Sequence, residues 1–500
     1  MSQATRRHSL DTPPPTSNRR RRHSTSIIGS QDLPPPPPVK DTSPIQQHEF
    51  RSVRSSTNLS TYNSNNNNNS AQQPPVSSSP SITPAPATRT LPTASAPAEK
   101  PVPRDRYGFK KANQHITLSV YEAWAGSYIS YVERRRAKWI LLMKSYGLPT
   151  VNPERFPPKS DKVKRYVRKG IPPEWRGAAW FYFAGGPARL AQSRGAYWEC
   201  VERARAGELS GVDRDDIERD LNRAFPDNVR FKPDAPGWDQ READDDGQPG
   251  ETSIVRALRR VLQAFAVANP RIGYCQSLNF LAGLLLLFLD EDEEKAFIML
   301  GIVTNEHLPG THDRSLKNID IGVLMSCIQE SMPAVWVKID DTQEYGSLPT
   351  VSLALTSWFM SCFVGSLPIE TVLRVWDSFF YEGSKTLFRI ALAIFKLAEP
   401  DIRRLSDPME VFQVVQNAPR RLVDANALLE ACFRRRNGFG HLSQETIDVR
   451  RRERARAFGA EKASRADLLG VGEESGAVVR SSSRGGGRFK RSLSRRRAKT

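Results

Sequence analysis

Several features that would assign the protein to a membrane or to a secreted class are missing from the sequence. The longest apolar run, residues 280–289, falls well short of the ~20 residues that a membrane-spanning helix needs, so it predicts a core helix. No apolar stretch near the N-terminus is typical of a signal peptide, and we expect the protein to stay inside the cell. The five cysteines show neither zinc spacing nor a compact disulfide framework, which predicts buried free thiols.

Motifs for nucleotide and metal chemistry are missing as well. The sequence contains no G-x-x-x-x-G-K-[ST] run, the loop that cradles phosphates, so we expect no nucleotide site of its own. It contains no H-E-x-x-H motif, and His307 and His312 lie around Pro309 and Gly310 without further ligands nearby. This pattern predicts loop histidines. We therefore expect no metal and no cofactor bound by this chain.

The formal net charge of +18 is concentrated at the two ends of the chain. Residues 1–100 hold 11 Lys or Arg against 5 acidic residues, and residues 450–500 hold 16 against 5, which leaves about +1 for the middle. A nearly neutral folded region argues against a groove that follows phosphates, so we expect no nucleic-acid partner. The charged ends could hold the protein near anionic membrane lipids or an acidic partner, or they could simply keep it soluble.

Composition divides the chain into two biased ends and a middle that can fold. Residues 1–105 are rich in Ser, Pro and Asn, and residues 446–500 in Arg and Ser, with few large apolar residues to fill a core. We expect both ends to be disordered tails. The run Pro34–Pro38 is of the kind that SH3-type domains or polarity proteins bind. The residues between the tails hold regular apolar clusters, enough for a large core.

Apolar residues in the middle of the chain recur at three- and four-residue steps, which is typical of helices. No sustained two-residue alternation flanked by hairpin turns is present, so the sequence predicts an all-α fold. A helical segment over residues 106–160, with its main helix at Thr117–Tyr146, precedes the core, and a helical extension over residues 398–445 follows it. Residues 232–250 predict a long exposed loop. Elsewhere we expect helices at Trp175–Phe183, Ala188–Trp198, Asp215–Arg223, Ser253–Ala268, Leu278–Leu289, Glu293–Val303, Ile319–Glu330, Met332–Ile339, Leu353–Phe363, Ile369–Tyr381, Lys385–Leu397 and Pro408–Asn417.

One candidate site residue, Arg223, lies near the end of a predicted helix. In the segment Ile217-Glu-Arg-Asp-Leu-Asn-Arg223, Ile217 and Leu221 are one turn apart and would face the core. Asp220 and Arg223 are three residues apart and can pair on the neighbouring face, and Pro226 ends the helix soon after. A rigid support is thus predicted to project the guanidinium outward. Taken alone, a helix-terminal arginine is usually a solvated or ion-paired residue.

A second candidate, Gln276, lies between two apolar helices in the segment Pro270-Arg-Ile-Gly-Tyr-Cys-Gln-Ser-Leu-Asn279. Gly273 permits a tight approach of the backbone, and Gln276 falls at or just before the start of the following helix. Its amide can donate and accept hydrogen bonds together, as the orientation of a water molecule requires. Taken alone, such a residue is a capping or turn glutamine in most proteins.

Six segments, taken in order, resemble those of TBC domains, which activate Rab-type small GTPases. Arg168-Lys-Gly-Ile-Pro-Pro-Glu-Trp-Arg-Gly-x-x-Trp180 resembles the opening motif. Ile217-x-x-Asp-x-x-Arg223, with Phe225-Pro226 and Asn228, resembles the arginine motif, and Gly273-Tyr-x-Gln276 the glutamine motif. Later segments are matched by Leu367-Pro368, by Leu373-Arg-Val-Trp-Asp-Ser-Phe-Phe380, and by Glu382-Gly383 with Leu387-Phe-Arg389. The resemblance predicts a multi-helix TBC domain over residues 168–397.

The resemblance implies a mechanism and the residues that perform it. Arg223 would be an arginine finger and Gln276 a glutamine finger, which enter the active site of a Rab GTPase in trans. Asp220 would hold Arg223, and Tyr274 would shape the glutamine loop. GTP and Mg²⁺ would belong to the partner, so the protein would be a GTPase activator and not itself an enzyme. Four further residues are expected to be structural, with the Arg and the Asp as a buried ion pair beside the tryptophans: Arg176, Trp180, Trp376 and Asp377.

Within the family, the chain looks most like the fungal Rab activators of polarised growth and secretion. We therefore expect a cytoplasmic protein that is recruited peripherally to membranes or to sites of polarised growth. Two departures from the family pattern are Ser277, where many members have Gly, and Ala224, often Thr; Ser277 would tighten a helix cap. The alternative is a non-catalytic Rab-binding or polarity scaffold that uses its proline-rich and basic tails. The presence of both Arg223 and Gln276 favours activation.

Overall fold

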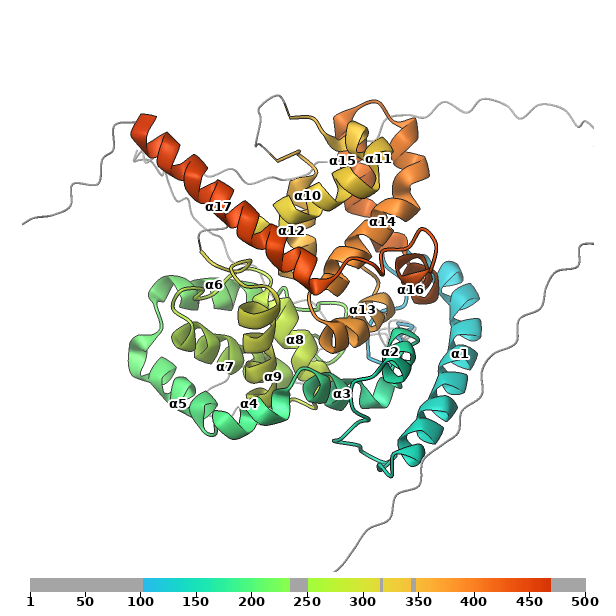
Figure 1. Ribbon diagram of the computed structural model, residues 1–500. Coiled ribbons are helices and arrows are strands. Elements are labelled where there is room, and N and C mark those ends of the chain that lie inside the picture. The colour runs from blue at the N-terminus through green and yellow to red at the C-terminus, as the bar shows by residue number, and fades with distance from the viewer. Residues whose placement is uncertain (1–101, 234–250, 315–317, 343–347, 469–500) are drawn as a thin grey trace, which may run out of the picture. The chain divides into compact units, whose positions relative to one another are not determined.

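The computed structural model describes residues 102–233, 251–314, 318–342 and 348–468 (Figure 1). Over these ranges the chain is helical, and its only β pairing is two isolated bridges, Arg104 with Lys110 and Phe109 with Asn228. The predicted all-α fold is confirmed for this part of the chain. The disordered tail predicted over residues 1–105 is wrong at its end, because Arg104 forms a bridge with Lys110 and donates to the Asp227 carbonyl oxygen. The rest of that tail, with the proline-run site at Pro34–Pro38, lies outside the described residues. So do residues 469–500 of the second predicted tail and most of the loop predicted at 232–250.

The helices are numbered in chain order. The first are α1 Leu118–Ser145, α2 Asp161–Arg168, α3 Arg176–Phe183, α4 Gly186–Gln192, α5 Ala196–Arg203, α6 Gly211–Leu221, α7 Ser253–Ala268, α8 Leu278–Phe288 and α9 Glu293–Gly301. They are followed by α10 Ile319–Ser331, α11 Pro333–Ile339, α12 Ser352–Met360, α13 Ile369–Glu382, α14 Lys385–Arg404, α15 Pro408–Asn417, α16 Ala425–Phe433 and α17 Gln444–Leu468. Short 3₁₀ turns lie at Pro173–Trp175 and Pro419–Arg421, and π-helical turns at Ala204–Glu208 and Ile302–His307.

Most of the predicted helices are present, because apolar spacing and caps are local signals. α7 and α15 have the predicted bounds, and Thr117 caps α1 by accepting a hydrogen bond from the Val120 N–H. The single helix predicted at residues 188–198 is wrong. α4 and α5 replace it, separated at Gly195, whose φ of 76° is left-handed. α2, which Ser160 caps, was not predicted.

The disordered tail predicted from residue 446 is wrong for its first part, because α17 continues to Leu468 (Figure 1). This helix packs against α10. Arg451 Nε donates to the buried Asp320 Oδ1 over 2.7 Å, and Arg450 Nη2 donates to Glu330 over 2.6 Å. The segment has few apolar residues, so its composition gave no sign of packing. Part of the positive charge assigned to the tail therefore lies on the folded unit.

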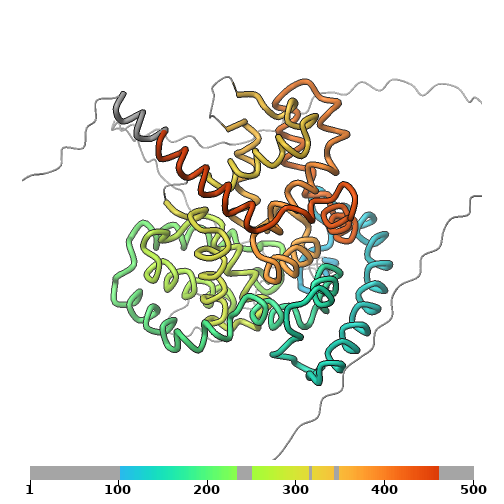
Figure 2. The backbone as a smooth tube through the Cα atoms, viewed as in Figure 1, coloured from blue at the N-terminus to red at the C-terminus, as the bar shows by residue number. Residues whose placement is uncertain are grey.

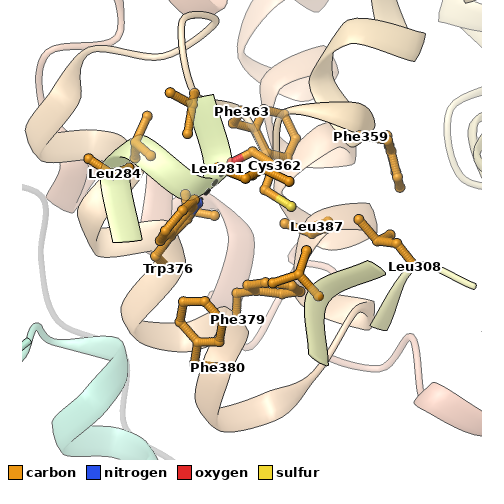
Figure 3. Packing of buried hydrophobic residues seen from close by; sticks show 14 of the residues in the cluster. Leu281, Leu284, Leu308, Phe359, Cys362, Phe363, Trp376, Phe379, Phe380 and Leu387 are labelled. Carbon is orange, nitrogen blue, oxygen red and sulfur yellow. Dashed lines mark hydrogen bonds between the residues drawn. The ribbon is translucent and has the colours of Figure 1, made fainter. Parts of the chain in front are cut away.

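The core of the unit is centred on α13, in which residues 370–381 are all buried. Trp376 is fully covered, and its Nε1 donates to the Cys362 carbonyl oxygen over 3.0 Å (Figure 3). Leu281 and Leu284 of α8 belong to the same cluster. α6 and α8, which flank the two candidate site residues, also pack on α7. Close packing of this kind gives the site a fixed frame.

Early and late parts of the described chain meet at α13 (Figure 2). Arg374 Nη1 donates to Asn426 Oδ1 of α16 over 2.7 Å and lies 3.4 Å from the Tyr128 hydroxyl of α1. Trp139 Nε1 of α1 donates to the Gly170 carbonyl oxygen over 2.8 Å. The helical segment that precedes the core is thus anchored in it.

No helix within the described ranges is long and apolar enough to cross a membrane. Cys200, Cys327, Cys362 and Cys432 are buried free thiols, as predicted. Cys275 differs and is partly exposed, because it lies in the loop of the glutamine motif, which reaches the surface.

Candidate functional site

Arg223 projects from the C-terminal end of α6. Ile217 and Leu221 of this helix are buried, as their one-turn spacing predicts, and they anchor it in the core. The helix ends at Leu221, and Phe225, with a φ of 48°, turns the chain before Pro226. The Arg223 side chain stays 63% exposed. A rigid helix end therefore presents the guanidinium to solvent.

Asp220 and Tyr274 lie behind this arginine. Asp220 is buried, and its Oδ1 lies 3.4 Å from Arg223 Nη1. Its Oδ2 accepts a 2.8 Å hydrogen bond from the Tyr274 hydroxyl, and its carbonyl oxygen accepts one of 3.0 Å from Asn279 Nδ2. Burial first, and then the charge of Asp220, raise the pKa of Tyr274 above its usual value, so the phenol keeps the proton that it donates. The Asp220–Arg223 pair expected from the spacing is present.

Gln276 lies in a tight loop directly before α8, and its side chain is exposed. Gly273 in this loop has a φ of 61°, which favours glycine, and a Cβ there would displace Arg314 and come within 2.8 Å of the buried Asp213 Oδ1. The Tyr274 N–H donates to Asp213 Oδ1 over 2.9 Å. These contacts fix the backbone on the N-terminal side of Gln276.

Ser277, on the other side of Gln276, has a left-handed backbone with a φ of 94°. Its hydroxyl makes no cap hydrogen bond, so the tightened cap expected from the sequence is wrong. The Ser277 Oγ is buried and has no hydrogen-bond partner among the described residues. A left-handed position favours glycine, so the serine at this position strains the backbone.

Arg223 and Gln276 line one surface pocket of about 160 Å³. Its other lining residues are Asp216, Arg219, Asp220 and Tyr274. Arg219 Nη1 pairs with Asp216 Oδ1 at 2.8 Å, one turn before the Asp220–Arg223 pair. Sequence reasoning missed Arg219, although its spacing from Asp216 repeats that of Arg223 from Asp220. The pocket presents two guanidiniums and one amide, which are groups that bind phosphate oxygens and orient water.

A buried aspartate behind the pocket joins parts that are distant in the sequence. Asp213, in the first turn of α6, is 5% exposed. Arg314 Nη2 donates to its two carboxylate oxygens over 2.8 and 2.7 Å, and the same carboxylate accepts the Tyr274 N–H. Arg314 lies 101 positions away, so no local pattern could have identified this contact. Asp213 supports the loop of Gln276 without lining the pocket.

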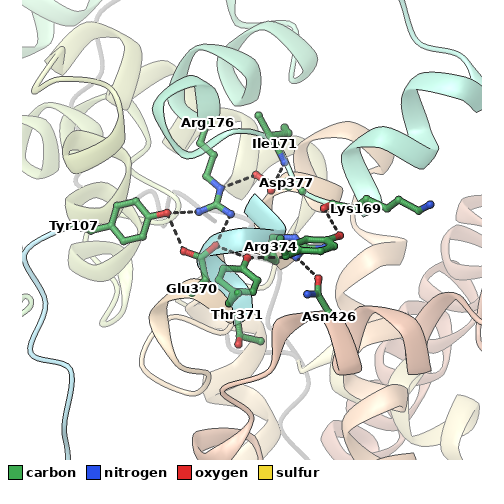
Figure 4. Close-up of polar contacts among 12 residues, drawn as sticks. Tyr107, Lys169, Ile171, Arg176, Glu370, Thr371, Arg374, Asp377 and Asn426 are labelled. Atoms are coloured by element: carbon green, nitrogen blue, oxygen red, sulfur yellow. Dashed lines mark hydrogen bonds and ion pairs between the residues drawn. The ribbon is translucent and has the colours of Figure 1, made fainter. Parts of the chain in front are cut away.

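The four residues expected to be structural lie in the core and do not line this pocket. Arg176 Nη2 donates to Glu370 Oε1 over 2.7 Å, and its Nε lies 3.4 Å from Asp377 Oδ1 (Figure 4). Asp377 Oδ1 also accepts from Trp180 Nε1 over 2.9 Å. Trp376 lies in the cluster of Figure 3. The expected pair of Arg176 with Asp377 is present, but sequence reasoning missed the shorter contact with Glu370.

Glu370 is the centre of this polar network (Figure 4). Its carboxylate accepts hydrogen bonds from the hydroxyls of Tyr107 and Tyr128 over 2.8 and 2.7 Å, besides the one from Arg176. Burial by itself would raise the pKa of Glu370, but Arg176 and the two tyrosines outweigh burial and lower it. An ionised carboxylate therefore joins α1, α3, α13 and the segment before α1.

The histidines His307 and His312 have separate protein surroundings. His312 Nε2 lies 2.8 Å from the Met360 carbonyl oxygen, whereas the His307 ring packs on Phe379. Burial, with a smaller effect of Lys159 and Arg451, lowers the pKa of His307 to about 4. In the described part of the chain, no group of three or more His, Cys, Asp or Glu residues could hold a metal ion.

The chain resembles known proteins in sequence and in fold. A family model of the Rab-GTPase-TBC domain matches residues 173–403. The GTPase-activating protein MSB4 of Saccharomyces cerevisiae is 40% identical over 418 residues, which cover 72% of this chain and 82% of that protein. This chain belongs to the Rab-GTPase-TBC family.

The Rab-GTPase-TBC domain extends from the turn at Pro173 into α14 and includes every residue of the 160 Å³ pocket. The GTPase-activating protein GYP3 of S. cerevisiae is 42% identical over 405 residues, and the match covers 69% of this chain but only 62% of that protein. The crystal structure of the Chlamydomonas flagellar RabGAP TBC domain is 30% identical, with a TM-score of 0.51 over 66% of this chain and 98% of that one. This likeness supports the helical fold described above.

Proposed function

We propose that the protein stimulates GTP hydrolysis by a Rab-type GTPase and supplies Arg223 and Gln276 to that partner's active site. The observation that supports this most is that both side chains line one surface pocket, although they come from different motifs. GYP3 and MSB4 are GTPase-activating proteins by name, which supports the same activity. The sequence has no phosphate-cradling loop, so the pair acts on a nucleotide that another protein holds.

Arg223 acts as the arginine finger. A small GTPase hydrolyses GTP slowly because its own site leaves charge on the transferring phosphoryl group incompletely stabilised. A planar, permanently charged guanidinium supplies that stabilisation, and such a finger is worth roughly 10³ to 10⁵ in rate. Asp220, itself tied to Tyr274, restricts the rotamers of Arg223 without covering it. The exposed guanidinium can therefore enter the partner's site with little loss of side-chain freedom.

Gln276 orients the attacking water in place of the partner's own glutamine. Its amide oxygen accepts a hydrogen bond from the water, and its amide N–H groups donate to a phosphate oxygen. The backbone on both sides is held, by the Tyr274 N–H bonded to Asp213 and by the left-handed Ser277. A held backbone limits the positions that the exposed amide can take.

We further propose that the partner acts in vesicle traffic, in particular in polarised secretion, and that the protein works in the cytoplasm at membranes or at sites of polarised growth. The resemblance to fungal Rab activators supports this setting. The partner supplies GTP and Mg²⁺, and this chain contributes side chains alone.

Single-turnover GTP hydrolysis by a panel of purified Rab GTPases, with and without the full-length protein, tests the proposal. We expect the wild type to accelerate at least one Rab. Arg223→Ala should lose roughly 10³-fold or more of that acceleration, and Arg223→Lys should recover little of it because an ammonium lacks the planar fork. The matched control is Arg203→Ala, which removes a half-exposed arginine at the end of α5 that pairs with Glu208, and it should leave the rate unchanged.

The contrary outcomes separate the alternatives. A wild-type protein that binds a GTP-loaded Rab without accelerating hydrolysis would favour the non-catalytic scaffold. An Arg223→Ala variant as active as the wild type would overturn the role of Arg223. Circular dichroism of each variant shows whether the fold is retained.

A further inference from the structure

The structure has a groove of about 510 Å³ that plays no part in the mechanism above, and the first of its lining residues after Arg223 is Phe225. Its first wall is Phe225–Asp227, at the end of the arginine motif. The loop Val364–Ile369, which leads into α13, and the segment 109–115, which leads into α1, form the others. Arg420 also lines the groove. One wall of the groove therefore follows Arg223, the proposed arginine finger, almost directly in the sequence.

The walls of this groove are held in place by the protein. Phe225 and Phe363, which directly precedes one wall, have left-handed φ values of 48° and 68°. Bulky residues adopt this conformation only where their surroundings impose it. Phe225 packs edge-on against Phe109, with ring centroids 5.6 Å apart, and the Lys110 N–H donates to the Asp227 carbonyl oxygen over 3.1 Å. The groove is thus preformed.

Arg420 places a positive charge in the groove and forms no ion pair with a described residue, whereas the groove's Asp227 pairs with Lys110. Its Nη1 lies 3.5 Å from His115 Nε2, and its Nε is buried without a hydrogen-bond partner. Within the described ranges no carboxylate oxygen lies within the 4.0 Å of an ion pair with Arg420. The arginines of the finger pocket differ, since each pairs with an aspartate. Burial, followed by the charges of Arg420 and Arg421, lowers the pKa of His115.

We propose that this groove receives a segment of the GTPase that bears a carboxylate, and that Arg420 binds the carboxylate. The inference rests on the proposed function, because it takes the occupant to be the same protein that accepts Arg223. A guanidinium forms a two-point contact with a carboxylate, and it lacks such a partner here. The apolar rings of Phe109, Phe225 and Phe280 suit the rest of the segment. The groove thereby contributes to the choice of GTPase, since a partner without the carboxylate leaves the Arg420 guanidinium without a counter-charge in the interface.

Two substitutions in the full-length protein test this inference on a Rab that the wild type activates. Arg420→Ala removes the cation, and Ala112→Trp fills the groove from an exposed lining residue. Both should raise the KM for the GTP-loaded Rab by about tenfold or more and leave kcat within about twofold, because the groove binds ground state and transition state alike. Arg420→Lys keeps the charge and should show a smaller rise. The KM of Arg420→Ala should also depend less on salt than that of the wild type.

A control variant and a check of folding separate an effect of the groove on KM from a general loss of structure. Arg203→Ala should not change KM, and circular dichroism at the assay temperature shows whether Arg420→Ala remains folded. Unchanged KM in both Arg420→Ala and Ala112→Trp would overturn the inference, even though Arg223→Ala still abolished acceleration. A lower KM in either variant would assign the groove to another segment of this chain that competes with the GTPase, and would equally overturn it. If no Rab is accelerated but one binds, its dissociation constant replaces KM; if none binds, the proposed function and the inference both fail.

Discussion

The hydroxyl of Tyr274 donates a 2.8 Å hydrogen bond to the Oδ2 of Asp220, and this bond connects the loop of Gln276 with the helix end that presents Arg223. Asp220 Oδ1 faces Arg223, so one buried carboxylate serves both candidate fingers. The relative position of Arg223 and Gln276 therefore depends on the contact between Asp220 and Tyr274, which lie behind them.

Tyr274→Phe should reduce the acceleration of GTP hydrolysis while binding of the GTPase persists. The variant removes one hydroxyl and leaves a buried carboxylate with one hydrogen bond fewer, which costs about 1.5–3 kcal/mol of unfolding free energy. Loss of alignment between the fingers should lower kcat more than it raises KM. The matched control is Tyr381→Phe, which loses hydrogen bonds to Ser160 elsewhere in the core. Equal kcat in both variants at 25 °C would contradict the positioning role.

Ser277→Gly should stabilise the protein by about 1 kcal/mol. Glycine relieves the left-handed strain at a φ of 94° and removes a buried hydroxyl without a partner, which together outweigh the greater chain entropy of glycine in the unfolded state. Urea denaturation measures the change. Ser378→Gly is the control, because the Ser378 hydroxyl is also buried and unpartnered but lies inside helix α13, where glycine costs about 1 kcal/mol. Stabilisation of both variants, or of neither, would show that backbone strain at Ser277 is unimportant.

Glu370→Gln should lower the unfolding free energy by about 3 kcal/mol, because Arg176 would lose its closer counter-charge in the core and keep only Asp377, 3.4 Å away. Since folding lowers the pKa of Glu370, its contribution is present above about pH 4.3 and is lost as pH falls through the folded pKa. Glu174→Gln breaks the exposed Arg136–Glu174 pair and should cost less than about 1 kcal/mol. Equal losses in the two variants, measured by guanidinium denaturation at pH 7, would contradict the buried network.

Protonation of His307 in the unfolded chain should lower the unfolding free energy at mildly acid pH. Its folded pKa of about 4 lies below the unfolded value of about 6.5, so the unfolded chain binds the proton first as pH falls. The unfolding free energy should drop by about 2 kcal/mol from this group between pH 7.5 and pH 5. His307→Leu should remove this part of the pH dependence, whereas His441→Leu, at an exposed position, should leave it unchanged. Identical pH slopes for the wild type and His307→Leu would disprove the assignment.

The elements of the site differ in how far they were predictable. The spacing of Ile217, Leu221 and Arg223 predicted a helix with an arginine at its end, because buried faces repeat locally every three or four residues. Gly273 predicted the tight loop before α8, and its φ is positive. Ser277 was predicted to tighten the cap of α8, because a serine before a helix usually caps it. Its left-handed backbone and the missing cap hydrogen bond are visible only in the structure.

The sequence by itself determined the all-α architecture and most of the helices, because periodicity and caps act over a few positions. It identified Arg223 and Gln276 as candidates only through the order of the six family-like segments, since neither residue is informative alone. Tertiary structure alone decided which distant groups meet. It placed Arg314 on Asp213, Glu370 at the centre of the buried network, and α17 on α10 through Arg451 and Asp320. These ion pairs join separate helices or a helix and a turn, and their existence depends on how these elements pack, which no local pattern records.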